Sequence, residues 1–246
     1  MDGNKVDFAA SIGKIDLIKL LIQSGEKGTE CAINYSAKNG HLEVLKYLNS
    51  IGYKGAEDAI DNAFENAAKN GHLEVLKYLH SIGYKGAEDA IDNAFENAAK
   101  NGHLEILKYL NSIGYKGYKG AEDAIDNAFE NAAKNGHLEV LKYLHSIGYK
   151  GYKDVEDAID NAFENAAKNG HLEALKYLHS IGYKGAEWII DNAFKKAVKN
   201  GRLEELKYLH ELGYECSNDD EETCDDSFLP VGILVNEQDQ REETNI

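Results

Sequence analysis

Residues 63–79, AFENAAKNGHLEVLKYL, recur along the chain and decide its fold. Asn-Gly pairs mark the copies, and they are separated by 31, 31, 34, 34 and 31 residues, with a degenerate first copy around Gly13. Repeats of this length are typical of solenoids, in which each unit packs only against its neighbours. The pairs are Asn39-Gly40, Asn70-Gly71, Asn101-Gly102, Asn135-Gly136, Asn169-Gly170 and Asn200-Gly201.

Each copy has the pattern of a helix–turn–helix unit. In residues 55–84, apolar residues recur at i, i+3, i+4 and i+7, which predicts a first helix with one apolar stripe. Gly71 can adopt the left-handed conformation that ends such a helix, and a second apolar helix follows it. Alanines at 63, 67 and 68 predict close approach between neighbouring first helices. We count seven such helix pairs.

The array has predicted ends. Glu205 replaces the apolar residue of earlier copies (valine, isoleucine or alanine) and Arg202 replaces a histidine, as a terminal cap requires. We therefore assign residues 1–214 to the repeat array, with caps at about 1–25 and 186–214. Residues 215–246 carry eleven Asp or Glu against Arg241 alone, which predicts a disordered acidic tail. An apolar segment at 228–235 is either a binding motif or a segment that docks on the last repeat.

Composition excludes several classes of protein. A net charge of −16 argues against binding to a phosphate backbone, and no apolar run approaches the ~20 residues that span a bilayer. The N-terminal residues lack the pattern of a secretory signal. Three widely spaced cysteines fit a reducing compartment, so we expect an intracellular protein of the cytoplasm or nucleus. We also expect a monomer without a cofactor.

The stretch AA-KN-GHLEVLKYL resembles the ankyrin-repeat consensus, in which Ala-Ala-x-x-Gly-His precedes two apolar-rich turns. The match covers about twenty residues in five or six copies, and it is similar in style to arrays of large DNA viruses and amoebae. The consensus Thr-Pro-Leu-His is replaced by residues 62–65, and the hairpin finger by a helical-looking segment. The resemblance therefore implies an all-α, elongated solenoid of about seven repeats, with lengthened first helices and reduced or absent β-hairpin fingers. A tetratricopeptide array is the alternative, but spacings of 31 residues do not fit it.

The same resemblance implies that partners contact the concave first-helix face and the loops between repeats. On that face, an amide-and-lysine ladder would suit an extended acidic or polar peptide, and further asparagines lie one turn earlier, at 62, 93, 127 and 161. The alternative is a solvated helix face copied passively with the repeat, which the near-identity of the copies favours. The candidate protein-binding residues of the ladder are Asn66, Lys69, Asn97, Lys100, Asn131, Lys134, Asn165 and Lys168.

Departures from the repeat supply three further candidates. Trp188 stands where other copies have aspartate, and aromatic residues are enriched in binding hot spots. The other interpretation of Trp188 is that it covers the small Ala174. Tyr118 and Tyr152 lie in the two lengthened loops, either as partner contacts or as inert insertions.

Histidines at 41, 72, 103, 137 and 171 share one position of the repeat. Ligands of one zinc ion must lie within ~2.1 Å of it, whereas packed helices are roughly 10 Å apart. We therefore predict that these histidines order their own turns by local hydrogen bonds and that no metal is bound. The sequence also lacks a phosphate-binding glycine loop and a nucleophile motif, so we expect no enzyme.

These observations predict a non-catalytic protein–protein interaction scaffold. The alternative is a substrate-recruiting adaptor or antagonist of a ubiquitin-ligase-type complex that uses the C-terminal tail. A third hypothesis is a nearly neutral duplication product without a specific partner.

Overall fold

The computed structural model describes residues 4–53, 57–84, 88–114, 122–147, 155–182 and 187–213. These residues form fourteen α-helices in seven pairs and no β-strand, which confirms the predicted all-α repeat solenoid. The first helices of the pairs are α1 (Lys5–Ser11), α3 (Cys31–Lys38), α5 (Glu57–Lys69), α7 (Glu88–Lys100), α9 (Glu122–Lys134), α11 (Val155–Asn169) and α13 (Glu187–Lys199). The second helices are α2 (Ile15–Gln23), α4 (Leu42–Ser50), α6 (Leu73–Ser81), α8 (Leu104–Ser112), α10 (Leu138–Ser146), α12 (Leu172–Ser180) and α14 (Leu203–Glu211).

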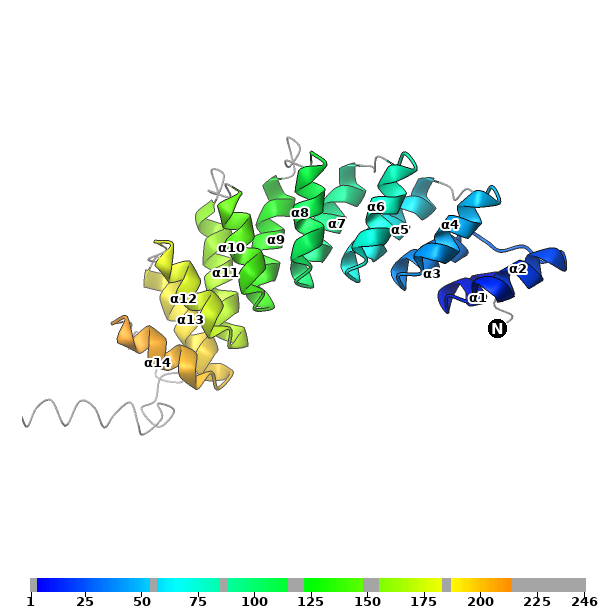
Figure 1. The fold of residues 1–246 in the computed structure, drawn as a ribbon. Helices are drawn as coiled ribbons and strands as arrows, with labels where there is room; N and C mark the ends of the chain where they lie inside the picture. The colour runs from blue at the N-terminus through cyan, green and yellow to red at the C-terminus, as the bar shows by residue number, and fades with distance from the viewer. Residues whose placement is uncertain are drawn as a thin grey trace, which may run out of the picture. The chain divides into compact units, whose positions relative to one another are not determined.

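The chain divides into two compact units, residues 1–128 and 129–246, with the division inside α9. In the first unit, α1, α3, α5 and α7 lie side by side in one layer, and α2, α4 and α6 follow one another in a second layer (Figure 1). In the second unit, α11 packs against α13, while α10, α12 and α14 are consecutive neighbours. The core of each unit therefore lies between a layer of first helices and a layer of second helices.

Small side chains bring the first helices together, as predicted. Ala63, Ala67 and Ala68 of α5 are fully buried, and Phe64 is 2% exposed. An alanine adds only a methyl group between two backbones, so neighbouring first helices make more extensive contacts than neighbouring second helices do. α5, α7, α9 and α13 have 13 residues each, against 9 in their partner helices. α1 and α3 have only 7 and 8 residues, so the predicted lengthening does not hold in the first two repeats.

The turn inside each pair is a helix C-terminal motif that needs glycine. After α5, Gly71 has φ 80°, in the left-handed region where a Cβ is strained. The backbone N–H of His72 donates to the carbonyl of Ala67 at 2.9 Å, and that of Gly71 donates to Ala68 at 3.3 Å. This pair of bonds is the Schellman arrangement, which satisfies carbonyls left over at the end of a helix.

The connections between pairs are described in part. Residues 24–30, which join α2 to α3, contain no strand. The other connections, where β-hairpin fingers would lie, include residues outside the described ranges. The prediction of reduced or absent fingers is thus met at the first connection and stays a prediction at the others.

The last repeat carries the substitutions on which the prediction of a cap rests, and the cap itself stays a prediction. Arg202 and Glu211 are exposed, and Lys196 forms an ion pair with Glu164 of the preceding repeat. Glu205 departs from the prediction because it is only 5% exposed, at a position that is also buried in the earlier copies. Nothing in the structure explains a carboxylate at this buried position. The acidic tail, 215–246, lies outside the described residues.

Candidate protein-binding surface

The candidate ladder lies on the first helices, near their C-terminal ends. The lysines of the ladder are exposed in all four copies, and the asparagines one turn earlier are half-buried. In the first unit the ladder comprises Asn66 and Lys69 on α5, and Asn97 and Lys100 on α7. In the second unit it comprises Asn131 and Lys134 on α9, and Asn165 and Lys168 on α11.

Asparagine amides on this face link neighbouring repeats. Asn66 Nδ2 donates to Asn34 Oδ1 of the preceding repeat at 2.8 Å. On α7, one turn before Asn97, Asn93 Nδ2 donates to Glu65 Oε1 of the preceding repeat at 3.1 Å. Asn127 donates to Glu96 at 3.1 Å, and Asn161 donates to Glu130 at 3.0 Å. A partner that used these amides would have to compete with bonds worth about 0.5–1.5 kcal/mol each. The lysines are therefore the more accessible half of the ladder.

The repeated histidine also links two repeats, which corrects the prediction of a bond within its own turn. His72 precedes the first residue of α6, and its ring reaches the turn of the preceding repeat. There, His72 Nε2 lies 3.0 Å from the carbonyl oxygen of Lys38. The ring covers Gly40 so closely that a Cβ on Gly40 would lie 2.7 Å from His72 Nδ1. We call this arrangement the His–Gly contact.

The His–Gly contact recurs within both units. His41 over Gly13, His103 over Gly71 and His171 over Gly136 bond to the carbonyls of Ser11, Lys69 and Lys134 at 3.1, 3.1 and 3.0 Å. In the last copy Arg202 replaces histidine, and its Nε donates to the carbonyl of Lys168 at 3.3 Å. The histidines therefore hold repeats together, and the described residues contain no group of three or more potential metal ligands.

Trp188 lies in the first turn of α13 and is 60% exposed. A side chain this exposed does not fill a gap in the core, so the structure does not support the interpretation that Trp188 covers Ala174. Ala174 is itself only 1% exposed. The other two departures from the repeat, Tyr118 and Tyr152, lie outside the described residues.

Two exposed aromatic residues escaped the analysis of the sequence. Phe8 on α1 is 62% exposed and Tyr35 on α3 is 40% exposed. Each stands five residues before the glycine of its turn, as Asn66 does before Gly71. The first unit thus presents Phe8, Tyr35, Asn66 and Asn97 at one repeat position. Aligning the degenerate first two copies with the others would have identified both aromatic residues.

The second helices carry a surface whose polar groups pair with one another. A Glu–Lys pair at i, i+3 recurs from α4 to α14, with separations of 2.6 to 3.1 Å and both partners exposed. Such exposed pairs contribute little to stability. Tyrosines of this face meet histidines of the preceding repeat, for example Tyr109 Oη at 3.0 Å from His80 Nδ1. Burial raises the pKa of Tyr109, and the nearby Lys77 opposes this effect. The surface has the character of a solvated helix face.

Among the described helices, none is both long enough and apolar enough to cross a membrane. The family model for ankyrin repeats, which spans three copies, matches residues 7–89, 64–157 and 95–186. A search of curated proteins finds no match. Among solved structures, the crystal structure of the human ASB11 ankyrin repeat domain is similar, with a TM-score of 0.59 and 17% sequence identity. The alignment covers 83% of this chain and 97% of that one. At this identity, the likeness concerns the fold alone.

Proposed function

Because the chain belongs to the ankyrin-repeat family, whose members generally serve as protein–protein interaction scaffolds, we propose that it is a non-catalytic scaffold for a protein or extended peptide. We assign binding to the first-helix face, where the ladder lies. The apolar residues of the first helices are used in stacking, so the groups available to a partner on this face are the polar and aromatic ones that repeat along it.

The observation that carries this proposal is the row of exposed lysines at equivalent positions of successive first helices. Lys69 and Lys100 occupy the last turns of α5 and α7, which are neighbours in the first layer. Lysine near a helix C-terminus is favoured by the helix dipole, which explains its presence in a single helix. Repetition on adjacent helices additionally creates a line of positive charge that suits carboxylates spaced along an extended chain. The proposed partner segment is therefore acidic or polar.

Trp188 and the two loop tyrosines, Tyr118 and Tyr152, are proposed as secondary contacts. The exposure of Trp188 supports its part of this assignment, because a large exposed aromatic side chain gains surface burial when a partner covers it. The adaptor alternative depends on residues 215–246, outside the described ranges, and no observation favours it.

The test compares two variants that change charge equally. One replaces the ladder lysines by glutamine, at 69, 100, 134 and 168. The matched control replaces second-helix lysines by glutamine, at 77, 108, 142 and 176, which are also exposed. Circular dichroism must first show that both variants fold like the intact chain.

The intact chain is used to select binders from a random peptide library, and the affinities of the selected peptides are then measured for all three proteins. We expect peptides rich in Asp and Glu, with at least a tenfold loss of affinity in the ladder variant and an unchanged affinity in the control. Equal losses in both variants would indicate attraction to net charge alone and would refute the assignment to the first-helix face. Peptides that bind all three proteins equally would refute it too.

A further inference from the structure

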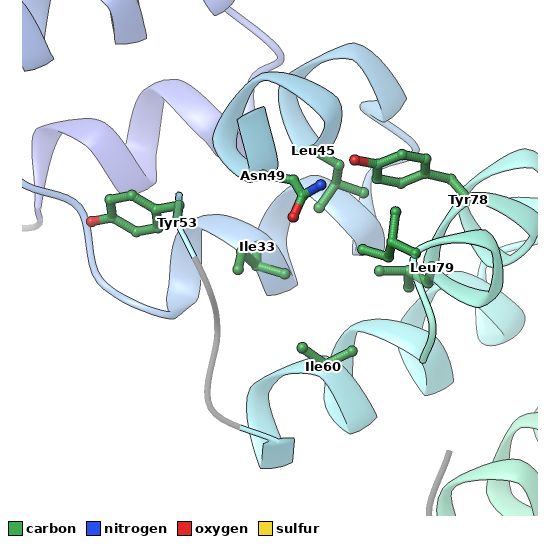
Figure 2. Close-up of a pocket in the computed structure, with 8 residues that line it drawn as sticks. Ile33, Leu45, Asn49, Tyr53, Ile60, Tyr78 and Leu79 are labelled. Atoms are coloured by element: carbon green, nitrogen blue, oxygen red, sulfur yellow. The ribbon is translucent and has the colours of Figure 1, made fainter. Parts of the chain in front are cut away.

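A cleft of about 240 Å³ opens in the first unit between the second and third repeats (Figure 2). It lies at the end of the helices where one repeat connects to the next, since Ile60 lies near the start of α5 and Ile82 just after α6. The walls are largely apolar, and Asn49 contributes an exposed amide. The lining residues on which the argument depends are Ile33, Leu45, Asn49, Ile60, Tyr78 and Ile82.

Two differences from the next repeat coincide with this cleft. Ile33 stands where the next repeat has Phe64, and Asn49 stands where it has His80. In that next repeat the Phe64 ring packs on Tyr84, with ring centres 5.2 Å apart. His80 Nδ1 lies 3.0 Å from Tyr109 Oη, across the joint to the fourth repeat. In the third repeat, aromatic rings therefore occupy this part of the unit.

A third difference is the direction of Tyr53, the counterpart of Tyr84. Tyr84 bonds to Asp61 of its own repeat. Tyr53 instead points away from Ile33 (Figure 2), and a Cβ on Gly28 would lie 2.8 Å from its hydroxyl oxygen. Burial, and then the charge of Asp7, raise the pKa of Tyr53, as expected for a hydroxyl enclosed by the first repeat. The cleft is therefore lined by the ring of Tyr53 but lacks the second ring, which Phe64 supplies in the next repeat.

The side chains around the cleft are more exposed than their counterparts at the next joint. Ile60 is half-buried, whereas the equivalent Ile91 is only 8% exposed. Ile82 is 44% exposed, whereas the equivalent Ile113 is half-buried. Ile60 and Ile82 are therefore more accessible at this joint than their counterparts at the next one, and Ile82 is as accessible as Ile51 and Ile147, which are 42% and 41% exposed.

We infer that the cleft binds one aromatic side chain of a polypeptide partner. The neighbouring repeat shows what this space accepts, because the ring of Phe64 lies there against Tyr84. An aromatic side chain buries about 150–250 Å² and so gains more from such a cleft than a smaller residue does. The amide of Asn49 lies at the opening, where it can bond to the backbone of the segment that carries the ring. The site is separate from the ladder, which lies at the opposite ends of the first helices, so either assignment can fail without the other.

The test uses the full chain with isotope-labelled isoleucine methyl groups, followed by NMR. N-acetyl-phenylalanine amide is titrated as the aromatic probe and N-acetyl-leucine amide as the aliphatic one. We expect the phenylalanine probe to shift the methyl signals of Ile33, Ile60 and Ile82 and to bind several-fold more tightly than the leucine probe. Ile147, which is 41% exposed at the position equivalent to Ile82, should not shift.

The decisive variant restores the consensus through Ile33→Phe and Asn49→His. It should keep the fold, raise Tm by filling the cleft, and weaken probe binding at Ile60 and Ile82 at least tenfold. Ile82→Glu, a change at an exposed residue, is the second variant and should weaken binding at Ile60 as well. Equal shifts at Ile147, equal affinity for the two probes, or undiminished binding by both variants would overturn the inference. So would the absence of shifts up to the solubility limit of the phenylalanine probe.

Discussion

The His–Gly contact predicts that two similar glycine substitutions will differ in their cost. Gly40 has φ 74° and Gly52 has φ 79°, so alanine at either position is held in the left-handed region. That strain costs about 1–2 kcal/mol in both variants. A Cβ on Gly40 would lie 2.7 Å from His72 Nδ1, whereas a Cβ on Gly52 would meet no atom within 4 Å.

In Gly40→Ala the imidazole must therefore move. Its movement breaks the 3.0 Å bond from Nε2 to the Lys38 carbonyl, a loss of about 0.5–1.5 kcal/mol. We expect Gly40→Ala to lower the free energy of unfolding by about 2–3 kcal/mol and Gly52→Ala by about 1–2 kcal/mol. In a His72→Ala background, the cost of Gly40→Ala should fall to that of Gly52→Ala, because no ring is left to displace.

Urea unfolding followed by circular dichroism measures these differences. Because repeat arrays can unfold in parts, hydrogen exchange of the α3 and α4 amides is the second measurement. The reasoning is refuted if the two glycine variants lose equal stability in the wild-type background. It is also refuted if the extra cost of Gly40→Ala persists when His72 is alanine.

Three further predictions concern other residues. Asp7 is 6% exposed and accepts bonds from the N–H and hydroxyl of Thr29 at 2.8 and 2.5 Å, so Asp7→Asn should cost about 1–3 kcal/mol in urea unfolding. Asp16→Asn, at an exposed position, should be nearly neutral by the same measurement, and equal costs would contradict the role of Asp7. Trp188→Asp restores the residue of the other copies. It should change the free energy of unfolding by less than about 0.5 kcal/mol yet weaken binding of the selected peptides. A large loss of stability would show that Trp188 has a structural role instead. Burial raises the pKa of Tyr109 above its ordinary value of 10.0. The stability that this burial contributes is therefore present below pH 10.0 and should fall as the pH rises through the folded-state pKa. Tyr109→Phe should reduce this fall, as measured by urea midpoints at pH values on both sides of 10.0.

The repeat unit itself could be predicted from the sequence because its determinants are local. The Asn-Gly pair places a left-handed residue after a helical apolar stripe, and Gly71 has that conformation. The alanines of α5 predicted close helix packing because an alanine side chain is apolar and adds only a methyl group between two helix backbones. Such features depend on one helix and one turn, and both are contained in a short stretch of sequence.

Contacts between repeats could not be predicted in the same way. The bond from Asn93 to Glu65 depends on how far α7 is shifted along its axis relative to α5. The apolar periodicity of either helix does not determine this shift. The partner of His72 was misassigned for the same reason, since the ring extends to a neighbour and not along its own turn. Tyr53 and Tyr84 have the same local sequence yet lie against different parts of the chain, and residues distant in sequence differ around them: Ile33 stands for Phe64 and Glu30 for Asp61.

The His–Gly contact has a consequence for how such an array can change over evolutionary time. It joins Gly40 to His72, 32 residues later, and Gly136 to His171, 35 residues later, with nearly the same closeness of ring and glycine. Stacking of these repeats therefore tolerates a difference of three residues in the connecting loop. The insertion at 152–154 can be gained, lost or altered while the joint keeps its geometry. For protein engineering, this loop is a position at which new recognition sequences can be grafted without redesign of the array.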